Sequence, residues 1–191
     1  MATAAIPAIE ENAMQSLYHL PIGEEAPQIV PVVVEIPKGT RNKIEYDPAH
    51  GVFRLDRVLY SPLHYPGDYG FIPQTLSLDG DALDVLVLVT DPTFTGCVVM
   101  AQPIGTLVMR DEKGEDEKIL AVPAHDPRFE EVNELTDLPA HTLREVEHFF
   151  EIYKLLEGKP TALLGWRTVR TAHTLIQEAH QRFMAKYGAS R

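Results

Sequence analysis

The feature that most constrains this fold is a series of short, closely spaced β-like segments in the first two thirds of the chain. Between about residues 29 and 123, brief apolar runs alternate with turn signals, among them those at residues 37–39 and 79–80. The run at residues 83–89 is apolar except at Asp84, which predicts a strand buried on both faces. Strands this short and this closely spaced are typical of a small barrel or sandwich.

The last third of the chain has a helical pattern. Residues 139–156 place their apolar side chains on one side, and Gly158 follows as a candidate C-cap. Residues 170–187 repeat the pattern and end before Gly188. No linker separates the two parts, so we expect one α+β domain in which helices pack outside a closed or nearly closed β core.

Composition excludes several classes of protein. The 191 residues suit one domain, and a formal net charge of −11 opposes a nucleic-acid groove or an anionic membrane surface. A single cysteine, Cys97, excludes an internal disulfide framework and a thiolate-rich zinc site. No apolar run approaches the roughly 18 residues of a membrane span. The first ten residues carry no positive charge, so we expect no secretory signal and a reducing cytoplasm.

Three carboxylates lie at the start of the strand expected from residue 83, at Asp79, Asp81 and Asp84. An ionised carboxylate at the edge of a core is costly unless it is paired, and Mg²⁺ and Ca²⁺ prefer clustered carboxylate oxygens. A plain hairpin turn explains Asp79 and Gly80 equally well, so this segment alone leaves a turn and a metal site as alternatives. A calcium EF-hand is excluded, because its Gly and Glu positions would be Asp84 and Thr90.

Other segments add charged and phenolic residues. Residues 111–118 hold a second acidic cluster, which on its own predicts a solvated hairpin. Residues 32–46 alternate acids and bases, which on its own predicts a hairpin with weak cross-strand ion pairs. Tyr65 and Tyr69 fall in an expected tight turn and Tyr153 on a helix stripe, where phenols more often pack than react. Together, the two acidic clusters favour a cation site more than either does alone.

In their order along the chain, these segments resemble the soluble inorganic pyrophosphatases of family I, which are single-domain, Mg²⁺-dependent enzymes. The resemblance runs from about Ser16 to Gly165 and Trp166. It implies an OB-like five-stranded β-barrel core with helices packed outside. It also implies that residues 1–15 are an N-terminal extension and that residues 16–191 form a single pyrophosphatase domain.

The resemblance further implies a role for each candidate site residue. Asp81 would be the general base that takes a proton from the attacking water, with several Mg²⁺ ions per active site. The implied metal ligands, direct or through water, are Asp79, Asp84, Asp111, Asp116, Glu35 and Glu45. The implied substrate-binding residues are Lys43, Arg57, Tyr69, Lys118, Tyr153 and Lys154, and Tyr65 would line the site beside them. Ala82 departs from the family signature, which usually has Pro or Glu there, and we expect only a slightly less rigid loop.

The charges of this residue set favour a metal-dependent reaction. The acids outnumber the bases, so the bare site would repel pyrophosphate, and bound Mg²⁺ reverses the sign. A dication also lowers the pKa of water that it binds. We therefore expect hydrolysis of pyrophosphate to two phosphates by a metal-activated water.

Two other classes of function explain part of the pattern. A non-enzymatic cation-binding or assembly module accounts for both acidic clusters, but not for the basic and phenolic residues between them. A metal-dependent phosphohydrolase for larger substrates such as nucleotides stays open, although no aromatic-lined base pocket is evident. At this short length the resemblance implies a homohexamer of bacterial type. The acidic net charge leads us to expect no nucleic-acid or membrane partner.

Overall fold

Eight strands and two α-helices make up the described part of the chain, residues 16–111 and 114–188 of a computed structural model. The strands are β1 Val30–Ile36, β2 Asn42–Asp47, β3 Val52–Val58, β4 Asp68–Ile72, β5 Leu83–Val87, β6 Val98–Asp111, β7 Gly114–Pro123 and β8 Ala162–Thr168. The helices are α1 Ala140–Ile152 and α2 Val169–Tyr187. The 3-10 helices are Leu17–His19, Pro127–Phe129, Leu135–Asp137 and Leu155–Glu157. The boundary expected at residues 1–15 lies outside the described residues.

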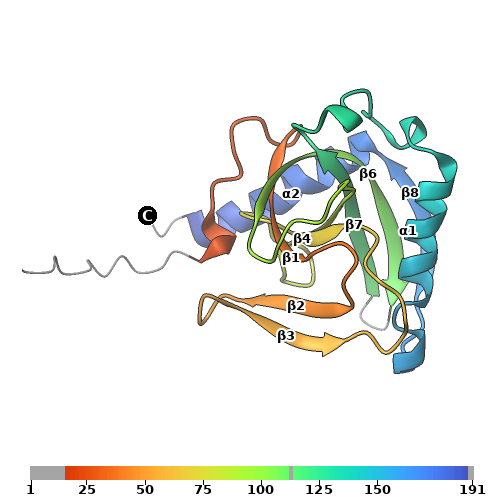
Figure 1. Cartoon of the computed structure of the whole chain (residues 1–191). Coiled ribbons are helices and arrows are strands. Elements are labelled where there is room, and N and C mark those ends of the chain that lie inside the picture. Colours follow the sequence, from red (N-terminus) through yellow and green to blue (C-terminus); the bar gives the residue numbers. More distant parts are fainter. Residues whose placement is uncertain (1–15, 112–113, 189–191) are drawn as a thin grey trace, which may run out of the picture.

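Five of the strands close into a ring (Figure 1). β1 pairs with β4, β4 with β5, β5 with β7, β7 with β6, and β6 pairs back with β1. The β5–β7 pair is parallel, and the other pairs in the ring are antiparallel. β8 extends the sheet by pairing with residues 105–110 of β6, on the same side as β1 and further along the strand. This arrangement confirms the expected OB-like five-stranded barrel of the α+β class.

Strands β2 and β3 form a separate two-stranded sheet beside the ring (Figure 1). Lys43 on β2 lies opposite Arg57 on β3 in their antiparallel register. The hairpin expected within residues 32–46 is therefore wrong, because β1 pairs with ring strands and β2 pairs with β3. The apolar residues of β1 favour the ring, since every residue of this strand is buried.

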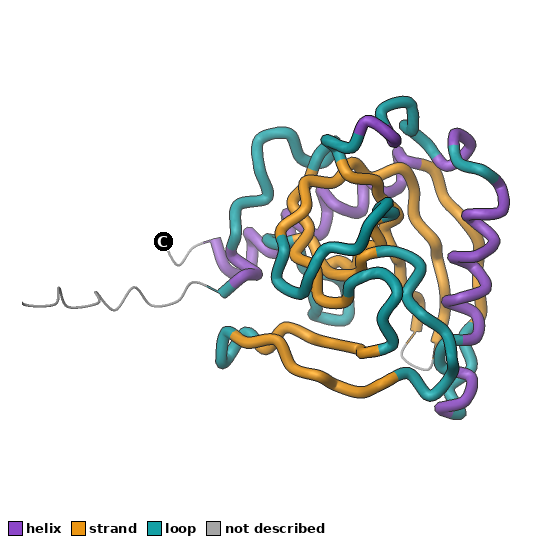
Figure 2. Tube along the Cα trace, viewed as in Figure 1, coloured by secondary structure: helices purple, strands orange, loops and turns teal. Residues whose placement is uncertain are grey.

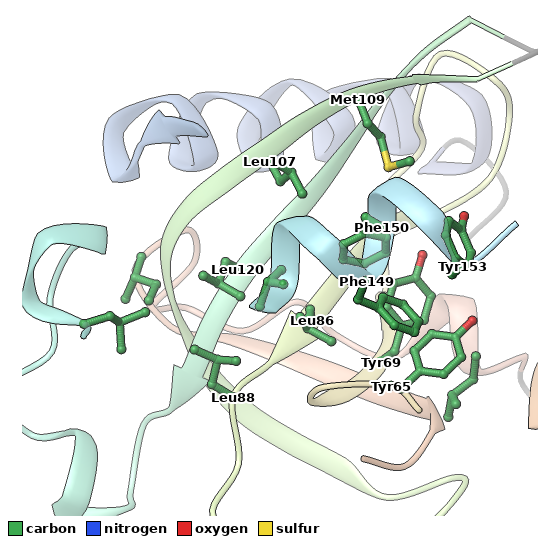
Figure 3. Packing of buried hydrophobic residues seen from close by; sticks show 14 of the residues in the cluster. Tyr65, Tyr69, Leu86, Leu88, Leu107, Met109, Leu120, Phe149, Phe150 and Tyr153 are labelled. Atoms are coloured by element: carbon green, nitrogen blue, oxygen red, sulfur yellow. The ribbon is translucent and has the colours of Figure 1, made fainter. Parts of the chain in front are cut away.

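Strand β5 is buried on both faces, as the apolar run at residues 83–89 predicted, and the second half of β7 is buried in the same way. Val85 and Ile119 belong to a core cluster that includes residues of all five ring strands and of α2. Leu86 and Leu120 point to the other face, into a cluster that α1 completes (Figure 3). The two helices therefore lie on the outside of the strands and cover different apolar surfaces (Figure 2). Within the described ranges, no helix is long and apolar enough to span a membrane.

Both expected α-helices are confirmed, with one change of boundary. α1 ends at Ile152, and the last part of the stretch expected to be helical forms the 3-10 helix Leu155–Glu157. Gly158 then adopts a left-handed conformation with a φ of 72°, as a C-cap glycine does. α2 runs over Val169–Tyr187 and ends beside Gly188, as expected.

Two strands differ from the sequence-based expectation. The tight turn expected around Tyr65 and Tyr69 is replaced in its second half by β4, a fully buried strand. Gly70 makes this possible, because a Cβ built there would lie 1.9 Å from the Val33 carbonyl oxygen on β1. β8 gave no clear signal, since it is a half-exposed strand at the end of the sheet that runs directly into α2.

Gly70→Ala should strongly destabilise the ring. The added Cβ collides with backbone, which cannot move aside without breaking the β1–β4 pairing. We expect a loss of about 3 kcal/mol in the free energy of unfolding and a melting temperature lower by roughly 10 °C. Gly188→Ala is the control, because its Cβ would meet only the flexible Met184 side chain. Equal melting temperatures for the two variants in a thermal scan would contradict this close approach.

Candidate active site

The predicted site residues come together around one cavity of about 820 Å³. Its walls come from the ring, from the β2–β3 hairpin and from the chain just after α1. It is lined by every predicted site residue except Tyr65, namely by Glu35, Lys43, Glu45, Arg57, Tyr69, Asp79, Asp81, Asp84, Asp111, Asp116, Lys118, Tyr153 and Lys154. Residues far apart in the sequence therefore share one concave surface.

Strand alternation explains how the ring supplies charged groups to this cavity. On β5, Asp84 lies two residues before the buried Leu86, and on β7, Lys118 lies two residues before Leu120. Side chains two apart point to the same face of a strand, so the charges continue the apolar outer face. Asp111 has the corresponding place at the end of β6. On this face, α1 packs over Leu86 and Leu120, and the charged residues Asp84 and Lys118 lie beyond them.

The Lys118 ammonium group is a buried positive charge in this cavity. Its side chain is 7% exposed, and Nζ forms ion pairs with Asp84 and, at 2.7 Å, with Asp116 Oδ2. Burial alone would lower the pKa of Lys118, but the two carboxylates more than offset this and raise it. The pKa of Asp116 is raised as well, because burial and the charges of Asp84 and Asp111 outweigh the effect of Lys118. The lysine is therefore a fixed cation among a surplus of acids.

Glu35 is a second buried acid of the cavity. Its carboxylate accepts a hydrogen bond from the Tyr46 backbone N–H at 2.7 Å. Burial, together with the charges of Asp84 and Glu45, raises its pKa from 4.5 to about 8. The pKa rises despite the Tyr46 hydrogen bond, so negative charge at this position is costly in the protein without a bound cation.

Two further basic groups are held in place by acids. Lys154 Nζ lies 2.9 Å from Asp111 Oδ2. Arg57 Nε lies 3.0 Å from the Glu157 carboxylate, which is 6% exposed, and Arg57 also pairs with Asp56. The Arg57–Glu157 pair connects the β2–β3 hairpin to the chain after α1. Both cations are therefore oriented before any ligand arrives.

The tyrosines form an aromatic cluster with the end of α1 (Figure 3). Tyr69 and Tyr153 line the cavity. Tyr65 does not; its ring packs on Phe149 with a centroid distance of 4.8 Å and lines a neighbouring cavity of about 710 Å³. Burial raises the pKa of Tyr65, Tyr69 and Tyr153, so these hydroxyl groups stay protonated and act as hydrogen-bond donors.

The segment between β4 and β5, residues 73–82, is named the acidic loop here. Asp79 and Asp81 are exposed on it and line the cavity. The Asp81 N–H donates to Asp79 Oδ1 at 3.1 Å, and the Ser77 N–H donates to the Asp81 carbonyl oxygen at 2.7 Å. The acidic loop is thus closed by its own hydrogen bonds, and it presents both carboxylates to the cavity.

The chemistry of the cavity fits hard metal ions. Within residues 16–111 and 114–188, no three His, Cys, Asp or Glu side chains are already arranged around one metal position. Lysine ammonium groups instead pair with several of the carboxylates, as Lys118 does with Asp84 and Asp116. Carboxylate oxygens are the ligands that Mg²⁺ prefers, and the raised pKa of Glu35 and of Asp116 indicates unmet negative charge. The donor set therefore suits added dications.

Sequence reasoning did not select several residues of this region. Glu157 and Asp56, which hold Arg57, were not selected, nor was Lys159, which lines the cavity. Asp56 had a visible signal, since it stands beside Arg57 in a strand of alternating charges. Glu157 had none, because it falls in the 3-10 helix Leu155–Glu157, where the helical pattern of α1 no longer applies.

Comparison with known proteins gives one consistent result. The sequence profile of the inorganic pyrophosphatase family matches residues 32–184. An inorganic pyrophosphatase of Halalkalibacterium halodurans is 52% identical over 157 residues, covering 82% of this chain and 96% of that protein. One of Methanosarcina mazei is 51% identical over 156 residues, covering 82% and 92%. This chain belongs to the inorganic pyrophosphatase family.

Solved structures of inorganic pyrophosphatases have the same fold. The crystal structure from Thermus thermophilus matches with a TM-score of 0.86 and 45% identity, covering 88% of this chain and 98% of that chain. The structure from Helicobacter pylori matches with a TM-score of 0.83 and 39% identity, covering 86% and 98%. The resemblance to family I pyrophosphatases is confirmed, and the matched range contains every candidate site residue.

In this member of the pyrophosphatase family, Glu35 should make stability depend on pH when metal is removed by a chelator. Between about pH 4.5 and 8 the folded protein holds a proton on Glu35 that the unfolded chain has lost. The free energy of unfolding therefore falls as pH rises through this window, and the loss is complete above the folded pKa. The glutamine side chain of Glu35→Gln does not titrate, so the free energy of unfolding of this variant should depend less steeply on pH.

Urea denaturation across this pH window, with chelator present, measures the effect. The exposed Glu24 provides a matched control, and Glu24→Gln should give a curve parallel to that of the wild type. Some slope should remain in Glu35→Gln, because Asp116 also has a raised pKa. A Glu35→Gln curve parallel to the wild-type curve would show that Glu35 titrates normally.

Proposed function

We propose that this protein hydrolyses pyrophosphate to two phosphates at the described cavity, with Asp81 as general base and several Mg²⁺ ions as cofactors. Membership of the inorganic pyrophosphatase family supports the reaction. The observation that carries the residue roles is that carboxylates, lysines, an arginine and tyrosines from distant segments line one cavity. A module that only binds cations would not explain why basic and phenolic side chains line the same cavity.

The basic residues and phenols are proposed to bind the two phosphate groups. Lys43 and Arg57 face the cavity from the hairpin, and Lys118 and Lys154 face it from the ring and from the end of α1. Each donates charge-assisted hydrogen bonds to phosphate oxygens, and the lost ion pairs with protein acids are replaced by pairs with the substrate. Fixed donors of this kind stabilise the charge that builds up on phosphate oxygens in the transition state.

Tyr69 and Tyr153 are proposed to donate neutral hydrogen bonds, since their hydroxyl groups stay protonated. Tyr65 is buried against Phe149 and does not line the cavity. We therefore assign Tyr65 a supporting function, in which it fixes the ring of Tyr69 at a centroid distance of 5.5 Å. This is a smaller role than direct contact with substrate.

Asp81 is proposed to take the proton of the attacking water. Its carboxylate is exposed in the cavity, at the end of a loop closed by hydrogen bonds. The water oxygen forms a bond to one phosphorus, the bond from this phosphorus to the bridging oxygen breaks, and the proton ends on a product phosphate. A positioned base of this kind contributes typically 10²–10⁴-fold to the rate.

The proposed holders of Mg²⁺ are Asp79, Asp84, Asp111, Asp116, Glu35 and Glu45, directly or through water. When bound, Mg²⁺ neutralises the charge of the substrate and lowers the pKa of a coordinated water. The raised pKa of Glu35 and of Asp116 supports this assignment, because a nearby dication would relieve the cost of their ionisation. Lys118 would then be released from part of its pairing and face the substrate.

We further propose a cytoplasmic homohexamer in which residues 16–191 act as one domain and residues 1–15 as an extension. The short length and acidic composition support this proposal. No nucleic-acid partner is expected for a chain with a formal net charge of −11. Light scattering of the purified protein tests the assembly, and a monomeric mass would contradict it.

Phosphate release from pyrophosphate, with Mg²⁺ or with a chelator, tests the proposed function. Rapid release that requires Mg²⁺ is the expected result. A parallel assay with a nucleoside triphosphate tests the competing assignment as a phosphohydrolase for larger substrates. Release from the nucleotide but not from pyrophosphate would overturn the proposal, and so would the absence of release from pyrophosphate.

Asp81→Asn and Asp84→Ala should separate catalysis from metal binding. Asp81→Asn should keep its affinity for Mg²⁺ and lose about 10²–10⁴-fold in turnover, because only the base is removed. Asp84→Ala should lose affinity for Mg²⁺ as well as turnover. Calorimetric titration with Mg²⁺ measures the first property, and phosphate release at saturating metal measures the second. Equal metal binding by the two variants would contradict this division of roles.

Arg57→Ala should weaken the binding of substrate and of the transition state. Loss of one such donor typically costs about 10²–10³ in rate, so a clear fall in kcat/KM is expected. Arg54→Ala is a suitable control, because Arg54 lies on the same strand and pairs with Asp47 instead. An unchanged kcat/KM in Arg57→Ala would contradict the proposed contact with phosphate.

A further inference from the structure

The C-terminal helix α2 is hydrogen-bonded to the start of the acidic loop. Arg182 Nε donates to the Leu76 carbonyl oxygen at 2.7 Å, and the Leu76 N–H donates to the Ala179 carbonyl oxygen at 3.0 Å. His180 Nδ1 lies 2.7 Å from the Gln74 carbonyl oxygen, so this nitrogen carries the proton and donates it. Three hydrogen bonds between this helix and the acidic loop therefore hold two residues of the loop, Gln74 and Leu76.

The backbone is unusual at the point where α2 holds it. Gln74 has a φ of 53°, and among the described residues it is the one non-glycine with a positive φ. Its N–H donates to the Tyr18 carbonyl oxygen at 2.8 Å, and its side-chain Oε1 accepts from the Ile22 N–H at 3.3 Å. A residue keeps this conformation only when its surroundings fix it. Contacts from α2 on one side and from the segment before β1 on the other provide that restraint.

A short hydrogen-bonded path leads from this contact to the proposed base. Leu76, held by Arg182, is followed directly by Ser77, whose N–H donates to the Asp81 carbonyl oxygen at 2.7 Å. Thr75 Oγ1 donates to the last residue of β4 at 2.6 Å and accepts from the first residue of β5 at 2.9 Å. The ends of the acidic loop are thus tied together, and the backbone position of Leu76 helps to set that of Asp81.

We propose that Arg182 and His180 are positioning residues for Asp81, acting through the backbone of residues 74–76. The inference rests on the proposed function, since it assigns Asp81 the part of the base. Neither side chain is among the described residues that line the cavity. The proposed route to the reaction is therefore the acidic loop and not contact with substrate, although the Arg182 charge also acts on Glu117, which lines the cavity.

Arg182→Met tests the positioning role in steady-state hydrolysis of pyrophosphate. Small displacements of a reacting group can cost about 100-fold, and we expect kcat to fall by about tenfold with KM changed less than twofold, because the phosphate-binding groups lie on other elements. Arg182→Lys should recover most of the rate, since its ammonium group can donate to the same carbonyl. Arg170→Met, an exposed arginine at the start of the same helix, should match the wild type.

A double-mutant cycle shows whether Arg182 acts through Asp81. In the Asp81→Asn background, Arg182→Met should change the residual kcat by less than twofold, because the positioned base is already gone. A tenfold loss of kcat on Arg182→Met in both the wild-type and the Asp81→Asn backgrounds would overturn the inference, because Arg182 would then act independently of Asp81. Should Arg182→Met fail to fold, His180→Ala provides the same measurements on the neighbouring hydrogen bond.

Hydrogen exchange of the metal-free protein gives a readout that does not depend on activity. The amide protons of Leu76 and Ser77 should exchange faster in Arg182→Met than in the wild type, while those of the ring strands stay unchanged. Wild-type exchange and wild-type kcat in this variant would overturn the inference and leave the proposed function intact. Absence of pyrophosphate hydrolysis by the wild-type protein would instead overturn the proposed function.

Discussion

On the outer face of the ring strands, apolar core residues and charged cavity residues lie only two positions apart. Leu86 and Leu120 are buried under α1, and Asp84 and Lys118 come two residues earlier on the same face. The boundary is kept by ion pairing, because the Lys118 ammonium is almost fully buried and would be costly there without its carboxylate partners. Tyr69 and Tyr153 lie at the same boundary, since they belong to the apolar cluster and also line the cavity.

Much of the fold could be predicted from the sequence, because local patterns determine most of its elements. Continuous apolar runs gave β1 and β5, and helical spacing gave α1 and α2. Pairing between distant strands has no local signal, so the pattern predicted a closed or nearly closed β core but not that β1 pairs with β6. β4 was hidden, because Gly70 is typical of a turn in sequence but serves close strand packing in the structure.

The composition of the site was more predictable than its internal pairing. Carboxylates interrupting apolar runs, such as Asp84, stand out in a sequence because burying a charge is costly. The distribution of hydrogen bonds among them depends on contacts between segments. Glu157 illustrates this, since its contact with Arg57 joins residues 100 positions apart. Glu157 was missed, whereas Tyr65 was wrongly assigned to the site. The order of the motifs places Tyr65 near the site, but it does not determine which cavity the ring lines.

The β2–β3 hairpin has a consequence for how the cavity opens. It carries Lys43 and Arg57 but lies outside the ring, and a lone two-stranded hairpin is only marginally stable in water. Its attachment to the rest of the protein depends on three of its residues. Arg57 pairs with Glu157, and Ile44 packs against the cluster that α1 completes. The Tyr46 ring packs on Phe71 at a centroid distance of 6.0 Å, and the Tyr46 N–H donates to Glu35. The two walls of the cavity therefore differ in local stability. Sub-global opening would withdraw Lys43, Arg57 and Glu45 from the active site together and leave the carboxylates of the ring strands in place.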